Sequence, residues 1–242
     1  MKILAIDTST RHLSLAVSDG DKTLASRNTR PRKDLSMTIT FDIERVLTKA
    51  NTRLSDLDGF VVGLGPGSFT SLRVGLSMLK AFVLVTGRPV VGVSSLDAVA
   101  MNVRVSRVRH GAGAQVCVIN DARRGMVYSS LYDKKGDALV RHREYQLEPL
   151  EKVLDGLAGE VIFIGDAIPL YREKIMLLAK DFKPVFEVEK RWLPKAQELA
   201  RIGYQRLLKG EVDKVDALAP LYLYPEDCQV GTAQDAPKRG HA

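Results

Sequence analysis

The stretch of sequence that organises this chain is Gly59-Phe-Val-Val-Gly-Leu-Gly-Pro-Gly-Ser-Phe-Thr-Ser-Leu-Arg73. Its apolar run at 60–62 predicts a buried strand, which breaks in a glycine-rich loop. A helix restarts at Ser68, a residue type that caps helices well. The free N–H groups and positive dipole end of that helix would face the loop, so Gly65, Gly67 and Ser68 could contact a phosphate. Close packing of the helix on its strand explains the same glycines, and spacing alone favours packing.

Two common nucleotide motifs are excluded in this loop. The glycines at 63, 65 and 67 are spaced Gly-x-Gly-x-Gly, whereas the dinucleotide fingerprint is Gly-x-Gly-x-x-Gly. No Gly-Lys-Ser or Gly-Lys-Thr follows, so the loop is not a P-loop.

Length and composition are typical of a globular protein. The 242 residues suit one large domain or two small lobes, and 45% are hydrophobic. An acid at Asp7 interrupts the first apolar run, which is too short for a signal peptide. No apolar run reaches membrane-spanning length, and two cysteines make no disulfide framework, so we expect a cytoplasmic protein without a membrane partner. The net charge of +7 suits RNA, although a solvated basic face gives the same value.

One pattern of elements occurs twice along the chain. An apolar strand ends in Asp7 and is followed by a hairpin and a third strand, and the same order begins with the strand that ends in Asp121. A strand, a glycine and a helix follow in each half, at Gly63 and at Gly165. We therefore predict an α/β protein with a duplicated actin-like (ASKHA, ribonuclease-H-like) fold, each lobe a mixed sheet flanked by helices. The expected division is a first lobe at 1–103, a reduced second lobe at 104–224 and a disordered tail at 225–242.

Few residues are suited to catalysis. The four histidines are isolated and form no metal-binding spacing, and Ser68 has no base evident in the sequence, so we expect no zinc or iron site and no serine hydrolase. Asp7 and Asp121 at strand ends could hold Mg²⁺. Each could instead cap its own hairpin turn. Capping is favoured for Asp121, beside Arg123 and Arg124, whereas the two readings of Asp7 stay open.

Two predicted helices carry a second apolar surface. The helix at 35–50 has an apolar stripe that leaves Met37 and Phe41 outside it, and the helix at 68–85 is apolar nearly all round, with Met78, Phe82 and Val85 off the first stripe. Such a surface is either a partner interface or is covered by the second lobe.

Four blocks of the sequence resemble the TsaB (YeaZ) family of bacterial tRNA-modification proteins. They are Ile3-Leu-Ala-Ile-Asp-Thr-Ser-Thr10, Gly65-Pro-Gly-Ser-Phe-Thr70 with Arg73 and Gly75, Asp121-Ala-Arg123 with Gly125 and Tyr128, and Pro220-Leu-Tyr-Leu223. The resemblance spans residues 1–224, and its Gly-Pro-Gly-Ser-Phe-Thr block is quite specific.

The resemblance implies a function. Members of this family are non-catalytic partners of the TsaD enzyme, which makes N6-threonylcarbamoyladenosine at position 37 of tRNAs that read codons beginning with A. The small ATPase TsaE completes the set, and family members alone form homodimers through the first-lobe helices that bind TsaD. No cofactor is then expected on this chain, because ATP or ADP and metal belong to the partner subunits.

The resemblance also assigns residues to sites. The partner interface takes Met37, Phe41, Leu72, Arg73, Met78, Phe82 and Val85. A phosphate or nucleotide contact would use Asp7, Thr8, Ser9, Gly65, Gly67 and Ser68. A family motif of unassigned role contains Asp121, Arg123 and Tyr128.

Departures from the catalytic relative favour a non-catalytic chain. TsaD-like proteins carry a His-x-x-x-His metal pair after the long helix, where this chain has Ser95 and Val99. Gly165 stands alone where ATPases of this fold carry paired glycines. Many family members also begin the first helix with a His-Ser or His-Thr pair. This chain has Leu35-Ser36 there, so no role of that histidine is transferred.

Other functions stay open at this stage. A small-molecule kinase of the same fold would need phosphate loops in both lobes and an acidic base, for which only Asp7 and its hairpin are candidates. A nuclease would need several clustered carboxylates for two metals, more than Asp7 and Asp121 provide. A glycoprotease-type hydrolase would need the missing histidine pair. Direct RNA binding would use Arg30, Arg32, Lys33 and the arginines of 104–109.

Overall fold

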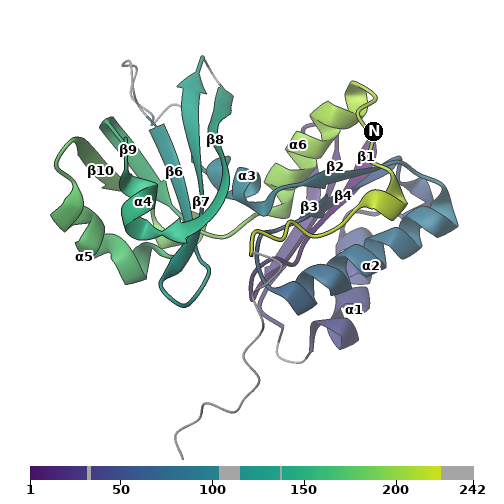
Figure 1. Ribbon diagram of the computed structural model, residues 1–242. Helices are drawn as coiled ribbons and strands as arrows, with labels where there is room; N and C mark the ends of the chain where they lie inside the picture. The colour runs from purple at the N-terminus through teal and green to yellow at the C-terminus, as the bar shows by residue number, and fades with distance from the viewer. Residues whose placement is uncertain (32–33, 104–114, 137, 225–242) are drawn as a thin grey trace, which may run out of the picture.

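The computed structural model describes residues 1–31, 34–103, 115–136 and 138–224, which form two lobes, each built on a five-stranded mixed sheet (Figure 1). The first sheet has the strand order β3-β2-β1-β4-β5. Its strands are β1 (Lys2–Asp7), β2 (Leu13–Asp19), β3 (Lys22–Thr29), β4 (Gly59–Gly63) and β5 (Val90–Val93). The first three pair antiparallel, and β4 and β5 add in parallel to β1.

The second sheet repeats this topology in the order β8-β7-β6-β9-β10. Its strands are β6 (Gln115–Asp121), β7 (Met126–Lys135), β8 (Ala138–Pro149), β9 (Gly159–Ile164) and β10 (Phe182–Phe186). Asp7 and Asp121 end the two equivalent strands β1 and β6, Gly63 ends β4, and Gly165 directly follows β9. The predicted duplication is confirmed.

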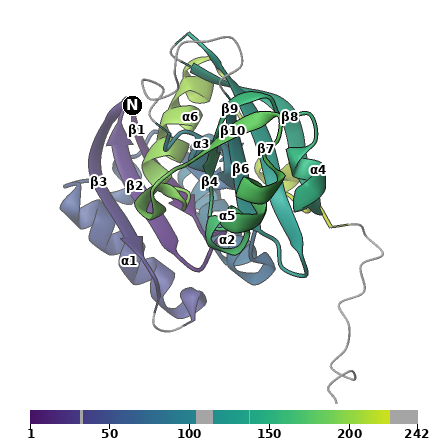
Figure 2. The ribbon, with the colours of Figure 1, turned by 90° about the vertical axis from the view of Figure 1, so that its left-hand side faces the viewer.

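Helices cover both faces of the first sheet. On one face lie α1 (Leu35–Lys49) and α2 (Phe69–Thr86), and on the other lies α6 (Ala196–Leu208) (Figures 1 and 2). The strands are therefore buried on both sides. Leu4 and Phe60 pack with α1 and α2, whereas Ile3 and Val61 pack with α6.

The second sheet is covered by shorter helices. One face packs on α4 (Leu150–Leu154) and α5 (Ile168–Leu178), and the other packs on α3 (Ser95–Ala100). Short 3₁₀ turns lie at Leu54–Asp56, Glu189–Arg191 and Val215–Ala217. Because Leu96 and Val99 of α3 enter the core of the second lobe while Ala98 enters that of the first, this short helix joins the two lobes.

The expected lobe division is wrong for the last part of the chain. Helix α6 falls within 104–224, yet its Ala196, Leu199 and Leu207 are buried in the first lobe. Gly203 lets this helix approach the sheet, because a Cβ there would lie 2.3 Å from Val61 Cγ2. An apolar stripe predicts a buried helix face but not which of two sheets it will cover. The tail at 225–242 and residues 104–114, where the predicted second lobe begins, lie outside the described residues.

Among the described residues, α2 is the one helix long and apolar enough to cross a membrane by length and composition. It packs Leu72, Leu76 and Leu79 into the first lobe.

The loop before α2 provides a test of this packing. A Cβ on Gly67 would lie 2.1 Å from the main-chain oxygen of Ser9, which cannot rotate away. We expect Gly67→Ala to lower the free energy of unfolding by about 3 kcal/mol, measured by urea denaturation. Gly210→Ala is the control, because its Cβ would meet nothing within 4 Å and only its positive φ costs energy, about 1–2 kcal/mol. Equal losses of unfolding free energy for the two variants would show that the loop can accommodate a Cβ at position 67.

Candidate functional site

Asp7 lies at the carboxyl end of β1 and is buried. Its Oδ1 accepts hydrogen bonds from the main-chain N–H of Ser9 at 2.9 Å and from Ser9 Oγ at 2.7 Å. Its Oδ2 accepts one from Ser95 Oγ on α3 at 2.5 Å. Burial raises the pKa of Asp7, and these hydrogen bonds lower it in part. The carboxylate thus caps its own turn and ties α3 to β1, and both of its oxygens have protein partners.

The glycine loop closes around this carboxylate. Gly63 has no room for a side chain, because a Cβ would lie 2.0 Å from Asp7 Oδ2. Gly65, which precedes a cis peptide bond to Pro66, donates its N–H to Ser95 Oγ at 3.1 Å and accepts from the main-chain N–H of Ser95 at 2.8 Å. The main-chain N–H of Ser68 donates to the Ser9 carbonyl at 2.8 Å. These contacts support the packing role of the glycines.

The expected phosphate contacts are largely closed off. Asp7, Thr8, Ser9 and Gly65 are buried, and a phosphate contact through them stays a prediction. Thr8 lies instead against Gly75 of α2, where a Cβ would come within 2.4 Å of Thr8 Oγ1. Of the six residues, Gly67 is half-buried and Ser68 is exposed.

The positions that correspond to the metal-binding pair of TsaD-like proteins have other roles. Ser95 and Val99 are both fully buried on α3, the first against Asp7 and the second in the core of the second lobe. Across the described residues, no three His, Cys, Asp or Glu side chains come together as a metal site would require.

The second lobe repeats the turn after Asp7 in a more open form. Asp121 is exposed, and its Oδ1 accepts the main-chain N–H of Arg123 at 2.8 Å, which is the expected capping of its own turn. The partner is that N–H and not the neighbouring guanidinium groups. Arg123 and Arg124 are exposed, with φ of 64° and 51°. Tyr128 is buried, and burial raises its pKa to about 12.

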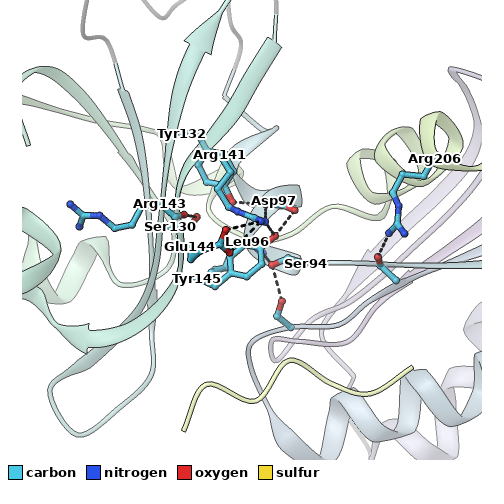
Figure 3. A network of polar contacts seen from close by, with 12 residues as sticks. Ser94, Leu96, Asp97, Ser130, Tyr132, Arg141, Arg143, Glu144, Tyr145 and Arg206 are labelled. Carbon is cyan, nitrogen blue, oxygen red and sulfur yellow. Dashed lines mark hydrogen bonds and ion pairs between the residues drawn. The ribbon is translucent and has the colours of Figure 1, made fainter. Parts of the chain in front are cut away.

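A polar network across the lobe junction was missed by the sequence analysis (Figure 3). Asp97 of α3 accepts hydrogen bonds from the phenol groups of Tyr132 on β7 and Tyr145 on β8, both at 2.7 Å. The guanidinium of Arg141 lies over the Tyr145 ring at 4.3 Å and 4.0 Å from the Asp97 carboxylate. These four residues come from three elements, α3, β7 and β8, that are far apart in the sequence, so no local pattern could have brought Asp97 together with the tyrosines.

A cavity of about 290 Å³ lies beside this network, between the lobes. Its lining includes Leu64, Asp97, Arg141, Tyr145, Arg206 and Leu221. Both arginines are already paired, because Arg206 donates to the Gly92 carbonyl at 2.7 Å and to Asp213 at 3.3 Å.

The last described segment bridges the two lobes. Leu221 donates its N–H to the Leu64 carbonyl at 2.7 Å, and Tyr222 accepts a hydrogen bond from Arg73 Nε at 3.2 Å. Tyr224 donates to the Ala122 carbonyl at 2.6 Å in the second lobe. This aromatic segment therefore docks on both lobes.

The outer side of α1 and α2 is partly apolar. Met37, Phe41 and Val85 are 61%, 62% and 81% exposed, and Leu84, which the sequence analysis left out, is 77% exposed. Met78 and Phe82 are half-buried and pack against the first-lobe core.

Two of the expected interface residues have different surroundings. Leu72 is 2% exposed and lies against Gly65 of the loop, so it belongs to the interior and its assignment to the interface is corrected. Arg73 lies near the start of α2, with its guanidinium 3.8 Å from the centre of the Phe69 ring. It is therefore about 18 Å along the helix from Val85.

Comparison with known proteins places this architecture. The family model described as "TsaD: tRNA N6-adenosine threonylcarbamoyltransferase" matches residues 30–230. A relative named "tRNA threonylcarbamoyladenosine biosynthesis protein TsaB" from Bacillus subtilis (strain 168) is 32% identical over 228 residues, covering 92% of this chain and 94% of the relative. The chain belongs to the TsaB (YeaZ) family. A protein of the same name from Escherichia coli (strain K12) is 28% identical over 227 residues, with the same coverage of the two chains.

Solved structures agree on the fold of this TsaB-family chain. YeaZ from Pseudomonas aeruginosa superimposes with a TM-score of 0.75 at 23% identity, covering 92% of this chain and 99% of that one. The resemblance noted from the sequence and the duplicated actin-like fold are both confirmed.

The junction around Asp97 yields a prediction for stability. Removing this carboxylate leaves two phenol groups without their acceptor, and hydrogen bonds to charged groups contribute about 1.5–3 kcal/mol each. We expect Asp97→Ala to lower the free energy of unfolding by about 3 kcal/mol in urea denaturation. Asp58→Ala is the control, because Asp58 accepts a single exposed main-chain N–H, from Lys2. When Asp97→Ala is made in a Tyr132→Phe background, it should lower the free energy of unfolding by measurably less than it does in the wild type.

The tyrosines of this junction also predict a dependence on alkaline pH. Burial and the charge of Asp97 raise the pKa of Tyr132 and of Tyr145 above the value of about 10 that the unfolded chain has. The folded state then keeps protons that the unfolded state releases, so stability is intact below pH of about 10 and falls as pH rises further. We expect Tyr132→Phe to flatten this decline in denaturation series between neutral and alkaline pH. An unchanged slope would mean that Tyr132 ionises equally in both states.

Proposed function

We propose that this chain is a non-catalytic subunit in the synthesis of threonylcarbamoyladenosine at position 37 of tRNAs that read codons beginning with A. It acts by pairing with a TsaD-type enzyme through α1 and α2. The pathway is supported by the names of the relatives in Bacillus subtilis and Escherichia coli. The pairing rests on one observation, the apolar side chains that α1 and α2 expose.

The chemistry of that surface suits a protein partner. Met37, Phe41, Leu84 and Val85 are large apolar side chains that stay mostly exposed in the described structure. Met and Phe are enriched in protein interfaces, and the fully buried centre of an interface is depleted in charge. Met78 and Phe82 lie half-buried beneath this surface and would be covered completely by a partner helix. In the absence of TsaD, the same surface would serve a homodimer.

The buried position of Asp7 at the end of β1 supports a scaffold role over an enzymatic one. A kinase of this fold would need Asp7 to face its metal and nucleotide, yet Asp7 is buried under Ser9 and Ser95. We therefore assign no cofactor to this chain. ATP or ADP and metal would be held by TsaD and by the ATPase TsaE, with tRNA as the substrate of the assembly. We place this assembly in the cytoplasm, away from the membrane.

Reconstitution tests the proposed function directly. Unmodified tRNA, threonine, bicarbonate and ATP would be incubated with the other components of the pathway, with and without this chain. The modified nucleoside is then measured by mass spectrometry of digested tRNA. Modification that needs this chain supports the proposal, whereas equal modification without it, or turnover of ATP by this chain alone, would contradict it.

The proposed interface predicts the behaviour of two variants. Phe41→Asp and Val85→Asp place a charge on the apolar side of α1 and α2, so burial against a partner would leave that charge unpaired. We expect both to abolish co-elution with the TsaD-type enzyme in gel filtration and to abolish modification in the reconstituted assay.

Leu177→Asp is the matched control for these variants. Leu177 is 80% exposed on α5 in the second lobe, so the same substitution there should leave both readouts unchanged. Circular dichroism confirms that each variant is folded. Wild-type co-elution of both Phe41→Asp and Val85→Asp would remove this surface from the interface.

A further inference from the structure

Exposed aromatic rings and arginines lie along the segment that bridges the two lobes. We define the arginine–aromatic strip as Phe69, Arg73, Arg123, Arg124, Tyr222 and Tyr224. In its first-lobe half, the Arg73 guanidinium lies over the Phe69 ring, and the Phe69 and Tyr222 rings are 5.3 Å apart between centroids. Arg73 Nε also donates to the Tyr222 hydroxyl, so these three side chains hold one another in place.

The strip continues into the second lobe through the bridging segment. Tyr224, two residues after Tyr222, donates to the Ala122 carbonyl and packs its ring edge-on to Tyr128 at 6.2 Å. Ala122 precedes Arg123 and Arg124, which hold left-handed backbone conformations and are exposed. One extended segment therefore connects the aromatic cluster on α2 to the arginine turn between β6 and β7.

The arginines of this strip are not held in ion pairs with described side chains. None of Arg73, Arg123 and Arg124 forms an ion pair with any described carboxylate. The nearby Asp121 and Asp166 accept main-chain N–H groups instead, from Arg123 and Asp121 respectively. Burial raises the pKa of Asp166, and the charge of Arg11, in the turn after β1, lowers it in small part, so Arg11 is a further cation near this turn.

We propose that the arginine–aromatic strip binds single-stranded RNA, with guanidinium groups on the phosphates and aromatic rings stacked on bases. Phe69, Tyr222 and Tyr224 are 51%, 48% and 36% exposed, so their rings are available for stacking. Proteins that bind single strands combine such rings with a positive surface that follows the backbone. This inference rests on the proposed function, in which the unpaired loop of a tRNA is the natural occupant.

Charge favours RNA over a protein as the occupant. A protein surface would have to supply one carboxylate for each of several arginines, whereas a short stretch of phosphates provides that charge at regular spacing. The whole chain carries a net charge of +7, which adds to the attraction for a polyanion. The strip is also distinct from the apolar side of α1 and α2, because Arg73 lies at the opposite end of α2 from Val85.

Fluorescence anisotropy of the full chain tests the proposal. The probes are a labelled unmodified tRNA transcript and a labelled single-stranded oligoribonucleotide, titrated over a series of salt concentrations. We expect Arg123→Ala/Arg124→Ala to lower the slope of log Kd against log salt by about 1.4, because each single-strand phosphate contact contributes about 0.7. Near physiological salt this corresponds to about tenfold weaker binding.

A second variant separates stacking from charge. Tyr222→Ala should weaken binding by about fivefold or more and leave the salt slope unchanged, because it removes a stacking surface without removing a charge. Arg45→Ala/Arg88→Ala is the matched control, since it removes two exposed arginines outside the strip. That control should bind both probes almost as the wild type does.

Three results would overturn the proposal. They are undetectable or salt-independent binding of both probes by the wild type, wild-type affinity of the arginine and tyrosine variants, and loss of co-elution with TsaD by those variants while RNA binding is unchanged. The last result would make the strip a protein contact. Because the reconstituted modification is measured separately, the proposed function can hold while this inference fails.

Discussion

A buried carboxylate at the end of the first strand is the interaction on which the structure depends. The Asp7 carboxylate accepts hydrogen bonds from Ser9 in its own turn and from Ser95 on α3. It also occupies the space that a side chain at Gly63 would need. Three elements far apart in sequence are thereby fixed around one group. A charged group is costly to bury, and hydrogen-bond donors on both oxygens reduce that cost. The start of α2 and the position of α3 both follow from this contact.

The two lobes are joined by shared packing as well as by polar contacts. Helix α3 contributes Ala98 to one core and Leu96 and Val99 to the other, while its Asp97 accepts the tyrosine hydroxyls of β7 and β8. The segment that ends in Tyr224 adds a second connection at the opposite edge of the junction. Such a junction favours one fixed arrangement of the lobes, which suits a subunit that presents surfaces to partners.

The surfaces that are proposed to be functional lie on the outside of the two lobes. The loop between β4 and α2, for which the sequence favoured packing but left contact with an anion open, is used for packing. The surfaces proposed to bind partners are the outer side of α1 and α2 and the arginine–aromatic strip. In physical terms, the same helix α2 presents an apolar surface near its end and a charged aromatic one near its start.

The sequence by itself determined the strands, the glycine loop, the duplicated order of elements and the second apolar surface that contains Met37 and Phe41, because local hydrophobic period and turn residues encode all of these. It also carried the family motifs. Only the tertiary structure decided that α6 returns to the first lobe, that Leu72 is interior and that Asp97 meets Tyr132 and Tyr145. These features depend on which surfaces meet across long stretches of chain, and no local spacing records that choice.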